Sequence, residues 1–376
     1  LNTAFIYEKR LNMYLKEIKI TNFRNYKNTI VKLYNKINII YGNNAVGKTN
    51  LLESIYVLGT IKSHRSFIDN NLIKKGCEFF VLKGRLMKNN FEYNLELNYK
   101  SIKKLKIDNK EIKKVSDYIS KMNVIIFYPD DLEIIKGSPS IRRNFMNIEL
   151  IQLHNNYINI LSEYNQILKM RNELLKSNLT KNNQYLQILT EYLIKRSIII
   201  YKMRDNLIFK INELIPKIYK NITGDNGFYI KYKPNIIYND NSDKTINDMI
   251  IKYKENYDKE LRLGKTLFGP HLDNIEFFLN DINLKYCGSQ GQQRIAIIVI
   301  KLSLIEIYKC NNKETPILLL DDVFSELDIK KKNNLLKYID NNMQTIITTT
   351  DLDNFDEKIL SNANIVMIEN GKIIEK

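Results

Sequence analysis

A phosphate-binding loop pattern near the start of the chain limits its fold more than any other segment. Residues 42–49 fit the pattern G-x-x-x-x-G-K-[ST]. The apolar run Ile37–Tyr41 precedes them, and a helix-like segment from Thr49 to Gly59 follows them. A strand, a glycine-rich loop and a helix in this order point consecutive backbone N–H groups at a phosphate. The pattern therefore predicts an α/β chain that holds a phosphate between a buried strand and the next helix.

The loop also predicts which atoms meet the ligand. Lys48 would neutralise charge on the β- and γ-phosphates, and Thr49 would coordinate Mg²⁺. The alternative, a chance glycine-rich turn, is disfavoured by the strand and helix on either side. The candidate nucleotide-binding residues of the loop are Gly42, Asn43, Asn44, Ala45, Val46, Gly47, Lys48 and Thr49.

A second candidate functional segment lies near the other end of the chain and ends in two carboxylates. Ile317–Leu320 is apolar throughout and leads into Asp321 and Asp322. A buried strand of a mostly parallel sheet delivers the side chains at its carboxyl end to the ligand crevice. We therefore expect Asp321 to hold the metal, directly or through water. A strand that merely ends in an acidic turn is the alternative.

Between these segments, the run from Ser289 to Gln292 has the features of a helix N-terminus. Ser289 can cap a helix, Gly291 permits a close backbone approach, and the residues from Ile295 onward are apolar. A serine beside free N–H groups makes a second phosphate-binding surface, so a ligand between two such surfaces is predicted. An ordinary capped helix is the alternative.

The rest of the chain divides by its hydrophobic periodicity. Alternation at period two predicts strands, and apolar residues at helical spacing predict two or three long helices between Ser140 and Ile222, with a break near 177–183. One further helix should end near Arg262. The predicted strands occupy Tyr14–Tyr41, Phe79–Met87, Phe91–Tyr99, Lys103–Ile107 and Val124–Tyr128, with tight turns at Asn89-Asn90 and Asp108-Asn109.

The charge of the chain leaves two interpretations open. The formal net charge is +16 and the pI is about 9.3, which suits a polyanionic partner such as nucleic acid. However, lysine accounts for most of the excess, and the chain is also rich in Asn, Ile and Tyr. A genome biased toward A and T would produce the same composition, so charge alone does not identify a partner.

Cysteine usage and hydropathy predict a cytosolic, soluble protein. The three cysteines, Cys77, Cys287 and Cys310, have neither metal-site spacing nor the even count of a disulfide framework, so we expect reduced thiols. The longest apolar stretch, Ile295–Tyr308, is interrupted by Lys301 and is too short to cross a bilayer.

Taken in order, the motifs resemble the RecF family of SMC-like, ABC-type ATPases. Ser289–Arg294, Asp321–Asp328 and Thr348–Asp351 look like the signature, the Walker B strand with its D-loop, and the switch segment. The resemblance extends from Met13 to Lys376. Further matching segments are Ile20–Tyr26, Lys62–Ser66, Phe127–Leu132, Lys136–Pro139 with Arg142-Arg143, Tyr164–Lys169 and Gly269–Asp273.

The resemblance implies an α/β fold: an ABC/SMC-like P-loop ATPase head with a mixed sheet and an inserted helical arm. Residues 1–12, which precede the recognisable pattern, would be a disordered segment or an extension from an upstream start. Residues 13–137 would form the N-terminal half of the ATPase lobe, with the P-loop and an antiparallel meander. Residues 138–262 would form the arm, and residues 263–376 the C-terminal half with the signature, Walker B, D-loop and switch.

The resemblance further implies that ATP joins two subunits head to tail. Ser289, Gly291 and Gln292 of one subunit would face Lys48 and Thr49 of the other. The second phosphate-binding surface predicted above would then complete the site of a neighbouring copy.

Other site residues follow from the resemblance alone. Asp322 stands where related ATPases carry the residue that polarises the attacking water, and its shorter side chain implies slow hydrolysis. Arg24 and Arg65 are candidate nucleotide contacts from the same subunit, unless they are solvated surface arginines. Asp130 or Asp131 would occupy the loop where relatives carry a sensing glutamine.

The chain departs from the family pattern at two positions. Leu272 replaces an expected arginine within Gly269–Asp273, and Ile295 replaces an expected threonine after the signature. The first change could weaken a contact near the site. His271 could either sense nucleotide or satisfy a turn.

The implied function is an ATP-dependent, DNA-binding protein of replication and recombinational repair. It would bind single-stranded, gapped or double-stranded DNA without sequence preference, assist RecA loading and the SOS response with RecO and RecR, and use weak ATP hydrolysis as a dimerisation switch.

Three alternatives share some motifs. A membrane transporter's nucleotide-binding subunit lacks the inserted helical lobe, a nuclease fusion needs more than the 48 residues after Asp328, and a small-molecule kinase lacks the signature serine.

Overall fold

The computed structural model describes residues 13–177, 184–238, 242–312, 314–323, 343–353, 355–369 and 372–374. The chain packs as two compact units. The first contains the residues up to 131, residues 220–224 and those from 298 onward; the second contains residues 132–219 and 225–297. These units group residues by packing, and the functional segments expected to begin at 138 and 263 stay a prediction.

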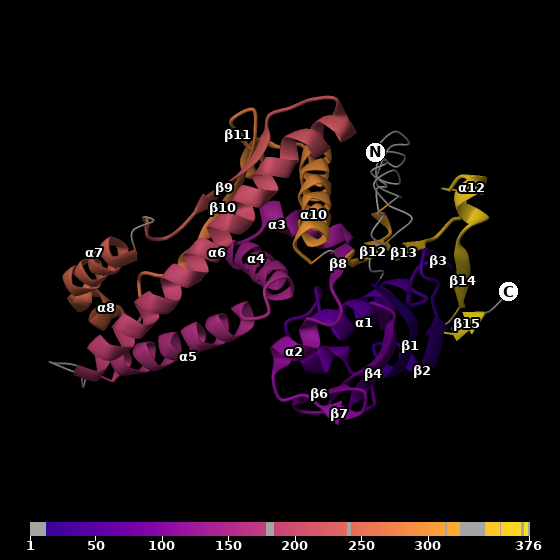
Figure 1. The fold of residues 1–376 in the computed structure, drawn as a ribbon, viewed down its shortest axis with the longest axis horizontal. Coiled ribbons are helices and arrows are strands. Elements are labelled where there is room, and N and C mark those ends of the chain that lie inside the picture. Colours follow the sequence, from indigo (N-terminus) through magenta and orange to yellow (C-terminus); the bar gives the residue numbers. More distant parts are fainter. Residues whose placement is uncertain are drawn as a thin grey trace, which may run out of the picture. The chain divides into compact units, whose positions relative to one another are not determined.

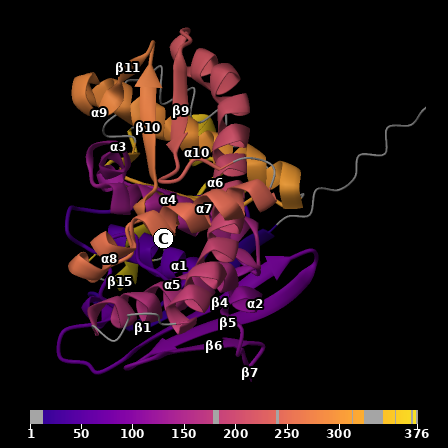
Figure 2. The same ribbon diagram turned by 90° about the vertical axis from the view of Figure 1, so that its left-hand side faces the viewer.

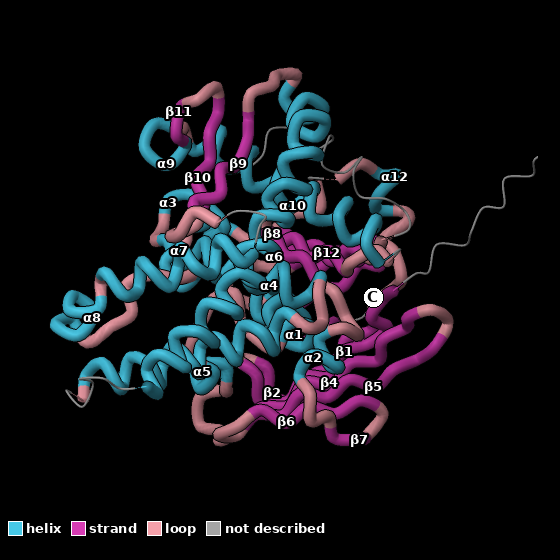
Figure 3. The backbone as a smooth tube through the Cα atoms, turned by 60° about the vertical axis from the view of Figure 1, so that its left-hand side comes forward, coloured by secondary structure: helices cyan, strands magenta, loops and turns pink. Residues whose placement is uncertain are grey.

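An antiparallel sheet forms one layer of the first unit (Figure 3). Its six strands have the order β2-β1-β4-β5-β6-β7. The predicted strands and both predicted turns are confirmed: Asn89, Asn90, Asp108 and Asn109 all have positive φ, as tight hairpin turns require. The strands are β1 (Met13–Phe23), β2 (Tyr26–Lys32), β4 (Phe80–Lys88), β5 (Phe91–Tyr99), β6 (Lys103–Ile107) and β7 (Lys110–Glu111).

A mixed sheet forms the other layer of this unit, with the order β15-β14-β3-β13-β12-β8. Neighbouring strands are parallel except β15, which is antiparallel to β14. The central strands are apolar and buried, as strands covered on both faces must be. The strands are β3 (Ile37–Tyr41), β8 (Val124–Phe127), β12 (Ile317–Asp321), β13 (Thr345–Thr349), β14 (Asn364–Glu369) and β15 (Lys372–Ile374).

Helix α1 (Lys48–Thr60) lies between these two sheets (Figure 1). It touches β8, β12 and β13 of the mixed sheet and β1, β4 and β5 of the antiparallel sheet, so nearly all of its residues are buried. Gly84 on β4 makes this approach possible, because a Cβ there would lie 2.5 Å from the Leu58 side chain. The helix that begins at the phosphate loop is thus held on two sides. Among the described residues of this unit, the remaining short helices are α2 (Val115–Ile119) and α12 (Glu357–Leu360), with 3-10 turns at Asp69–Leu72 and Pro129–Leu132.

The second unit is mainly helical. Three helices occupy the predicted region: α4 (Pro139–Leu153), α5 (Tyr157–Lys176) and α6 (Gln184–Thr223). Helix α5 ends where the break was predicted to begin, and the rest of that stretch, residues 178–183, lies outside the described part of the chain. The single helix expected to end near Arg262 is wrong, because α7 (Ser242–Glu255) and α8 (Tyr257–Leu263) are separate helices. Asn256 interrupts them, with φ of −104° and ψ of 11°. The other helices are α3 (Glu133–Lys136), α9 (Leu284–Cys287) and α10 (Gln290–Asn312), whose residues from Ile298 onward belong to the first unit.

A small antiparallel sheet, which the sequence analysis did not predict, lies beside α6 (Figure 2). Its order is β11-β10-β9, so β9 is an outer strand. Its strands are β9 (Phe228–Lys233), β10 (Asn274–Leu279) and β11 (Ile282–Asn283).

The Gly269–Asp273 segment holds this unit together through buried polar contacts. Arg204 donates to the Asp273 carboxylate and to the Pro270 carbonyl, both at 2.6 Å. His271 Nδ1 lies 2.6 Å from the Tyr164 hydroxyl, and its Nε2 lies 3.3 Å from the Thr266 carbonyl. Burial lowers the pKa of His271 to about 4, so the ring is neutral near pH 7. The packing of His271 therefore favours the turn-satisfying interpretation over a sensing role.

No helix among the residues that the structure describes is long and apolar enough to span a membrane.

Candidate nucleotide-binding site

The phosphate loop connects the carboxyl end of β3 to the first residue of α1. Gly47 precedes the helix with φ of 115°, a conformation that L side chains rarely adopt. A Cβ at this position would also lie 2.4 Å from the Asn25 side chain. Glycine is therefore required here by both backbone conformation and space, and the start of α1 presents its N–H groups as the sequence analysis expected.

Lys48 lies within this loop with its ammonium group bound to backbone oxygens. Its Nζ donates to the Gly42 carbonyl at 2.7 Å and to the Asn43 carbonyl at 2.8 Å. Burial lowers the pKa of Lys48, and the nearby carboxylates of Asp322 and Asp321 oppose that shift. A charged amine that is partly desolvated and surrounded by loop carbonyls is prepared to meet an anion.

The carboxyl ends of β3, β13 and β12 lie at the same edge of the mixed sheet, as those of neighbouring parallel strands do. Thr49 Oγ1 donates to Asp321 Oδ1 at 3.0 Å, although the two residues are 272 positions apart. Thr348, at the end of β13, donates to the same oxygen at 2.8 Å. Burial raises the pKa of Asp321, and its hydrogen bonds to Thr348 and Thr49 counter that effect. The P-loop and the end of β12 therefore form one site within the first unit.

The oxygen atoms gathered here fit a hard divalent cation. Mg²⁺ prefers carboxylate, hydroxyl, phosphate and water oxygens, and proteins commonly hold it with one or two side chains plus substrate phosphates. Thr49 and Asp321 supply such a pair. Among the described residues no group of three or more His, Cys, Asp or Glu side chains could hold a metal by itself. A metal at this site would depend on the nucleotide phosphates for its remaining ligands.

Asp322 follows β12 in a left-handed conformation, with φ of 52°. Its backbone N–H donates to Thr348 Oγ1 at 3.1 Å, so one threonine contacts both residues of the acidic pair. Thr348 was recognised only as part of the switch segment, and its place in the site comes from the parallel pairing of β12 with β13. The D-loop residues Ser325–Asp328 lie outside the described part of the chain.

Both candidate arginines bind one buried glutamate of α1. Arg24 donates from Nε and Nη2 to the two oxygens of Glu53, at 2.8 and 2.7 Å. Arg65 Nη1 lies 3.5 Å from Glu53 Oε2 and donates to Asn50 Oδ1 at 3.0 Å. Arg24 is half-buried against Glu53, whereas Arg65 is an exposed residue of this pair, so their roles toward a nucleotide stay a prediction. Glu53 was missed because one carboxylate inside an apolar helix gives no specific sequence signal.

The loop after β8 is attached to α10 by a buried ion pair. Lys301 Nζ contacts the Asp131 carboxylate and the Ile126 carbonyl. The Tyr128 N–H also donates to Asp131, at 2.9 Å. Burial raises the pKa of Asp131, and the charge of Lys301 opposes that shift. Asp131 is therefore a structural partner of α10, and Asp130 is the exposed carboxylate of this loop.

His64 is enclosed between two tyrosine rings beside these groups. Its ring centroid lies 5.2 Å from that of Tyr56 and 4.5 Å from that of Tyr128, and within the described part of the chain neither ring nitrogen has a hydrogen-bond partner. Burial, followed by the charges of Lys301, Arg65 and Arg24, lowers the pKa of His64 to about 3. The imidazole is therefore neutral at physiological pH.

This shift predicts a pH dependence of stability. The unfolded chain binds the His64 proton more tightly than the folded protein does. The buried neutral ring therefore contributes fully to the free energy of unfolding above pH 6.5, and this contribution is lost as pH falls toward 3. In the wild type, His64 should lower the free energy of unfolding by up to about 1.4 kcal/mol for each pH unit over that range. Replacing His64 with Phe should remove this pH dependence. Urea unfolding of both proteins between pH 7 and pH 4 measures this difference. Parallel pH profiles for the wild type and the variant would contradict it.

In the second unit, the predicted signature residues form a reciprocal cap at the start of α10. The Gln292 N–H donates to Ser289 Oγ at 3.2 Å, and the Ser289 N–H donates to Gln292 Oε1 at 2.9 Å. Gly291 is open to solvent, since a Cβ there would meet nothing closer than Ser289 Oγ at 4.0 Å. This confirms the predicted capped helix and leaves an exposed helix start. Ile295, where threonine was expected, is buried in the same helix.

Comparison with known proteins agrees with this geometry. Residues 14–374 match the family described as the RecF/RecN/SMC N terminal domain. Curated relatives called DNA replication and repair protein RecF from Bacillus cytotoxicus and Bacillus cereus are each 39% identical, over 372 and 374 residues. In both cases the match covers 96% of this chain and 98% of the relative.

Solved structures give the same result. The recombination mediator protein RecF of the RecFOR pathway, solved with ATP, superposes with a TM-score of 0.90 at 30% identity, covering 98% of this chain and 99% of that one. Its complex with an ATP analogue gives a TM-score of 0.87 at 31% identity, with coverages of 96% and 98%. An Smc head domain from Pyrococcus furiosus, 14% identical with a TM-score of 0.53 and 96% coverage of each chain, shares the fold.

Proposed function

The chain belongs to the RecF family, and we propose that it is an ATP-switched, DNA-binding protein of DNA replication and recombinational repair. The observation that carries this proposal is the contact between Thr49 of the P-loop and Asp321 at the end of β12. Relatives of this family have been solved with ATP and with an ATP analogue. A phosphate loop and an acidic strand end meet at one site in this chain.

ATP and Mg²⁺ would enter this site through groups already described. The N–H groups at the start of α1 and the Lys48 ammonium would bind the β- and γ-phosphates. Thr49 and Asp321 would hold Mg²⁺, which supplies charge neutralisation at the phosphates when bound. Asp322 would orient the attacking water, with its backbone held by Thr348. Arg24 and Arg65 would have to give up part of their contact with Glu53 to reach the nucleotide. We therefore propose that their main role is to hold the segments around α1 in place.

We further propose that ATP closes two copies head to tail. The exposed start of α10, with Ser289, Gly291 and Gln292, would bind the γ-phosphate held by the partner subunit. Two observations support this: the helix start is solvent-exposed, and the capping contact leaves the Ser289 hydroxyl proton free to donate. ATP would then act as a dimerisation switch with slow hydrolysis as its reset.

Replacing Ser289 with Arg tests the arrangement in trans. The variant should bind ATP with unchanged affinity, because its own P-loop is untouched, yet fail to dimerise because a bulky cation occupies the helix start. Nucleotide titration and light scattering measure the two properties separately. Ser177→Arg, at an exposed position that ends α5, is the control. Loss of ATP binding in the Ser289 variant would contradict the assignment.

DNA is the proposed partner of the ATP-bound dimer. Binding through lysines to the phosphate backbone should show little sequence preference and should weaken as salt rises. By relation to the RecFOR pathway, RecO and RecR are the proposed protein partners, and support of RecA loading on single-stranded gaps and of the SOS response is the proposed outcome, in the cytoplasm.

Fluorescence anisotropy with labelled gapped and duplex DNA tests this function. The expected result is binding that requires ATP and whose affinity falls linearly with salt on logarithmic axes. Affinity that is equal with and without ATP would contradict the switch. An absence of DNA binding at low salt would overturn the proposed function itself.

A further inference from the structure

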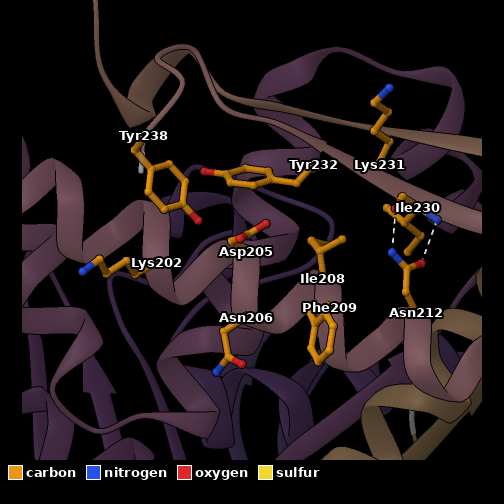
Figure 4. Close-up of a pocket in the computed structure, with 10 residues that line it drawn as sticks. All are labelled: Lys202, Asp205, Asn206, Ile208, Phe209, Asn212, Ile230, Lys231, Tyr232 and Tyr238. Carbon is orange, nitrogen blue, oxygen red and sulfur yellow. Dashed lines mark hydrogen bonds between the residues drawn. The ribbon is translucent and has the colours of Figure 1, made fainter. Parts of the chain in front are cut away.

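The second unit contains a hollow that none of the candidate nucleotide-binding residues lines. Its volume is about 510 Å³, and it lies between the middle of α6 and the outer strand β9 (Figure 4). Its walls combine aromatic rings, an acid, amides and two lysines. The lining residues are Lys202, Asp205, Asn206, Ile208, Phe209, Asn212, Ile230, Lys231, Tyr232 and Tyr238.

One end of the hollow is closed by a contact between the helix and the strand edge. Asn212 donates to the Ile230 carbonyl at 2.7 Å and accepts from the Ile230 N–H at 2.9 Å. The Ile230 N–H is thus turned away from β10. Because backbone groups alternate along a strand, the N–H and carbonyl of Tyr232 are turned away from β10 as well. The strand edge therefore adds a donor and an acceptor to the wall of the hollow.

The helix contributes polar side chains without partners. Among the described residues, neither Asp205 nor Asn206 makes a side-chain hydrogen bond or ion pair, and both are exposed. In Figure 4 the Asp205 carboxylate lies beneath the Tyr232 ring and beside the Tyr238 ring. A planar ligand with an amino group could therefore donate to Asp205 while it lies against an aromatic face.

Phe209 forms an aromatic wall that is unusually open to solvent. Its side chain is 61% exposed, and it projects into the lower part of the hollow (Figure 4). An exposed phenylalanine is a platform on which a nucleobase can stack, worth about 1–3 kcal/mol per base. Its exposure also means that removing the ring should not disturb the core.

The two lysines lie at the rim and point outward. The ammonium groups of Lys202 and Lys231 extend away from the hollow in different directions (Figure 4), and neither makes an ion pair among the described residues. This places positive charge on either side of the opening. A base inserted in the hollow would leave its flanking phosphates near these lysines. A cationic side chain from a protein would instead meet two like charges on entering.

We propose that this hollow binds a nucleobase of single-stranded DNA, with Phe209 as stacking platform, Asp205 as acceptor for an exocyclic amino group, and Lys202 and Lys231 on the neighbouring phosphates. The proposal rests on the proposed function, because it supposes that the protein binds DNA. It adds a surface outside the ATPase site that distinguishes single-stranded from duplex DNA, since a base is available for stacking only when unpaired.

The exposed face of α6 extends the hollow into a path for further nucleotides. Tyr185, Tyr192 and Lys195 are exposed on this helix at spacings of seven and three residues, and Lys195 Nζ lies 5.8 Å from the Tyr192 ring centroid. Residues so spaced share a helix face. Aromatic rings alternating with lysines are typical of surfaces that bind single strands without sequence preference.

The main test compares Phe209→Ala with Phe91→Ala, which removes a similarly exposed ring (67%) from the antiparallel sheet of the first unit. With ATP present, Phe209→Ala should bind labelled single-stranded DNA about tenfold more weakly, as expected for one lost stacking contact. Affinity for blunt duplex should not change, and Phe91→Ala should match the wild type. Equal single-strand affinity in all three proteins would overturn the proposal.

Base identity and crosslinking make the test specific. Wild-type protein should prefer oligodeoxycytidylate over oligothymidylate, because thymine has no exocyclic amino group, and Asp205→Ala should remove that preference. Ultraviolet crosslinking of iodouracil-containing DNA should map to Phe209 or Tyr238. Crosslinks confined to the first unit would contradict the assignment.

Two further arms separate the possible ligands. Competition by dCMP at concentrations matching the oligonucleotide would indicate a free-nucleotide site and overturn the single-strand assignment. Unchanged DNA binding by Phe209→Ala together with lost binding to purified RecR or RecO would identify a protein-docking surface instead. If wild-type protein binds no DNA at all, the proposed function fails, and the outcome is distinct from failure of the hollow alone.

Discussion

Replacing Lys48 with Ala should abolish ATP-dependent dimerisation while the fold remains intact. The ammonium group now rests on the Gly42 and Asn43 carbonyls, at the position where the β- and γ-phosphates are expected. Two charge-assisted hydrogen bonds would be lost, at about 1.5–3 kcal/mol each. A loss of about 3 kcal/mol corresponds to a roughly hundredfold weaker affinity for ATP. Titration with a fluorescent ATP analogue measures the affinity, and light scattering measures the dimer.

Lys27→Ala is the matched control, since Lys27 is an exposed lysine of β2 in the same unit. It should bind ATP and dimerise as the wild type does. Both variants should retain the wild-type circular dichroism spectrum. An ATP-induced dimer of normal strength in the Lys48 variant would show that the P-loop does not drive association.

Replacing Lys301 with Met should cause the largest loss of stability. Both Lys301 and Asp131 are only 4% exposed, so the variant leaves a buried carboxylate without its charge partner. Removing one partner of a buried ion pair costs about 3–5 kcal/mol. For a unit of this size that corresponds to a fall in Tm of about 10 °C. Differential scanning calorimetry of the full chain measures it.

The double variant Lys301→Met/Asp131→Leu distinguishes the ion pair from simple packing. Exchanging a buried pair for apolar residues of similar volume is often neutral or stabilising, so the double variant should regain most of the lost stability. Lys169→Met is the surface control, because Lys169 pairs with Glu173 within α5 and both side chains are largely exposed, and exposed pairs contribute little. If the double variant is less stable than Lys301→Met alone, the buried pair does not explain the loss.

Much of the first unit could be predicted from local sequence because its elements have strong periodic signals. The hairpin turns at Asn89-Asn90 and Asp108-Asn109 are residues that tolerate positive φ, and the strands beside them alternate cleanly. Ser289, a residue type that caps helices, marked the start of α10 in the same way, and the structure adds Gln292 as its reciprocal partner. Such features depend only on residues near each other in the chain, so no tertiary information was needed.

Other features could not be predicted from the sequence, because they have weak local signals or depend on partners far away in the chain. Asn256 gives no strong stop signal, and α7 and α8 were therefore read as one helix. Lys301 looked like an interruption of an apolar helix until Asp131 was found beside it, 170 residues away. The burial of Glu53 likewise could not be predicted, because its partners Arg24 and Arg65 come from other segments of the chain.

By itself the sequence determined the chemistry of the phosphate loop, the acidic end of β12 and the family to which they belong. A loop such as Gly42–Thr49 can be recognised from its own glycines and the adjoining strand and helix. The tertiary structure decided which distant groups complete it. Parallel pairing of β3, β13 and β12 brings Thr348 to Asp321, and two arginines and an aspartate find their counter-charges only across the fold. Buried charges must be paired, and the identity of the partner depends on the arrangement of whole elements, which no local pattern records.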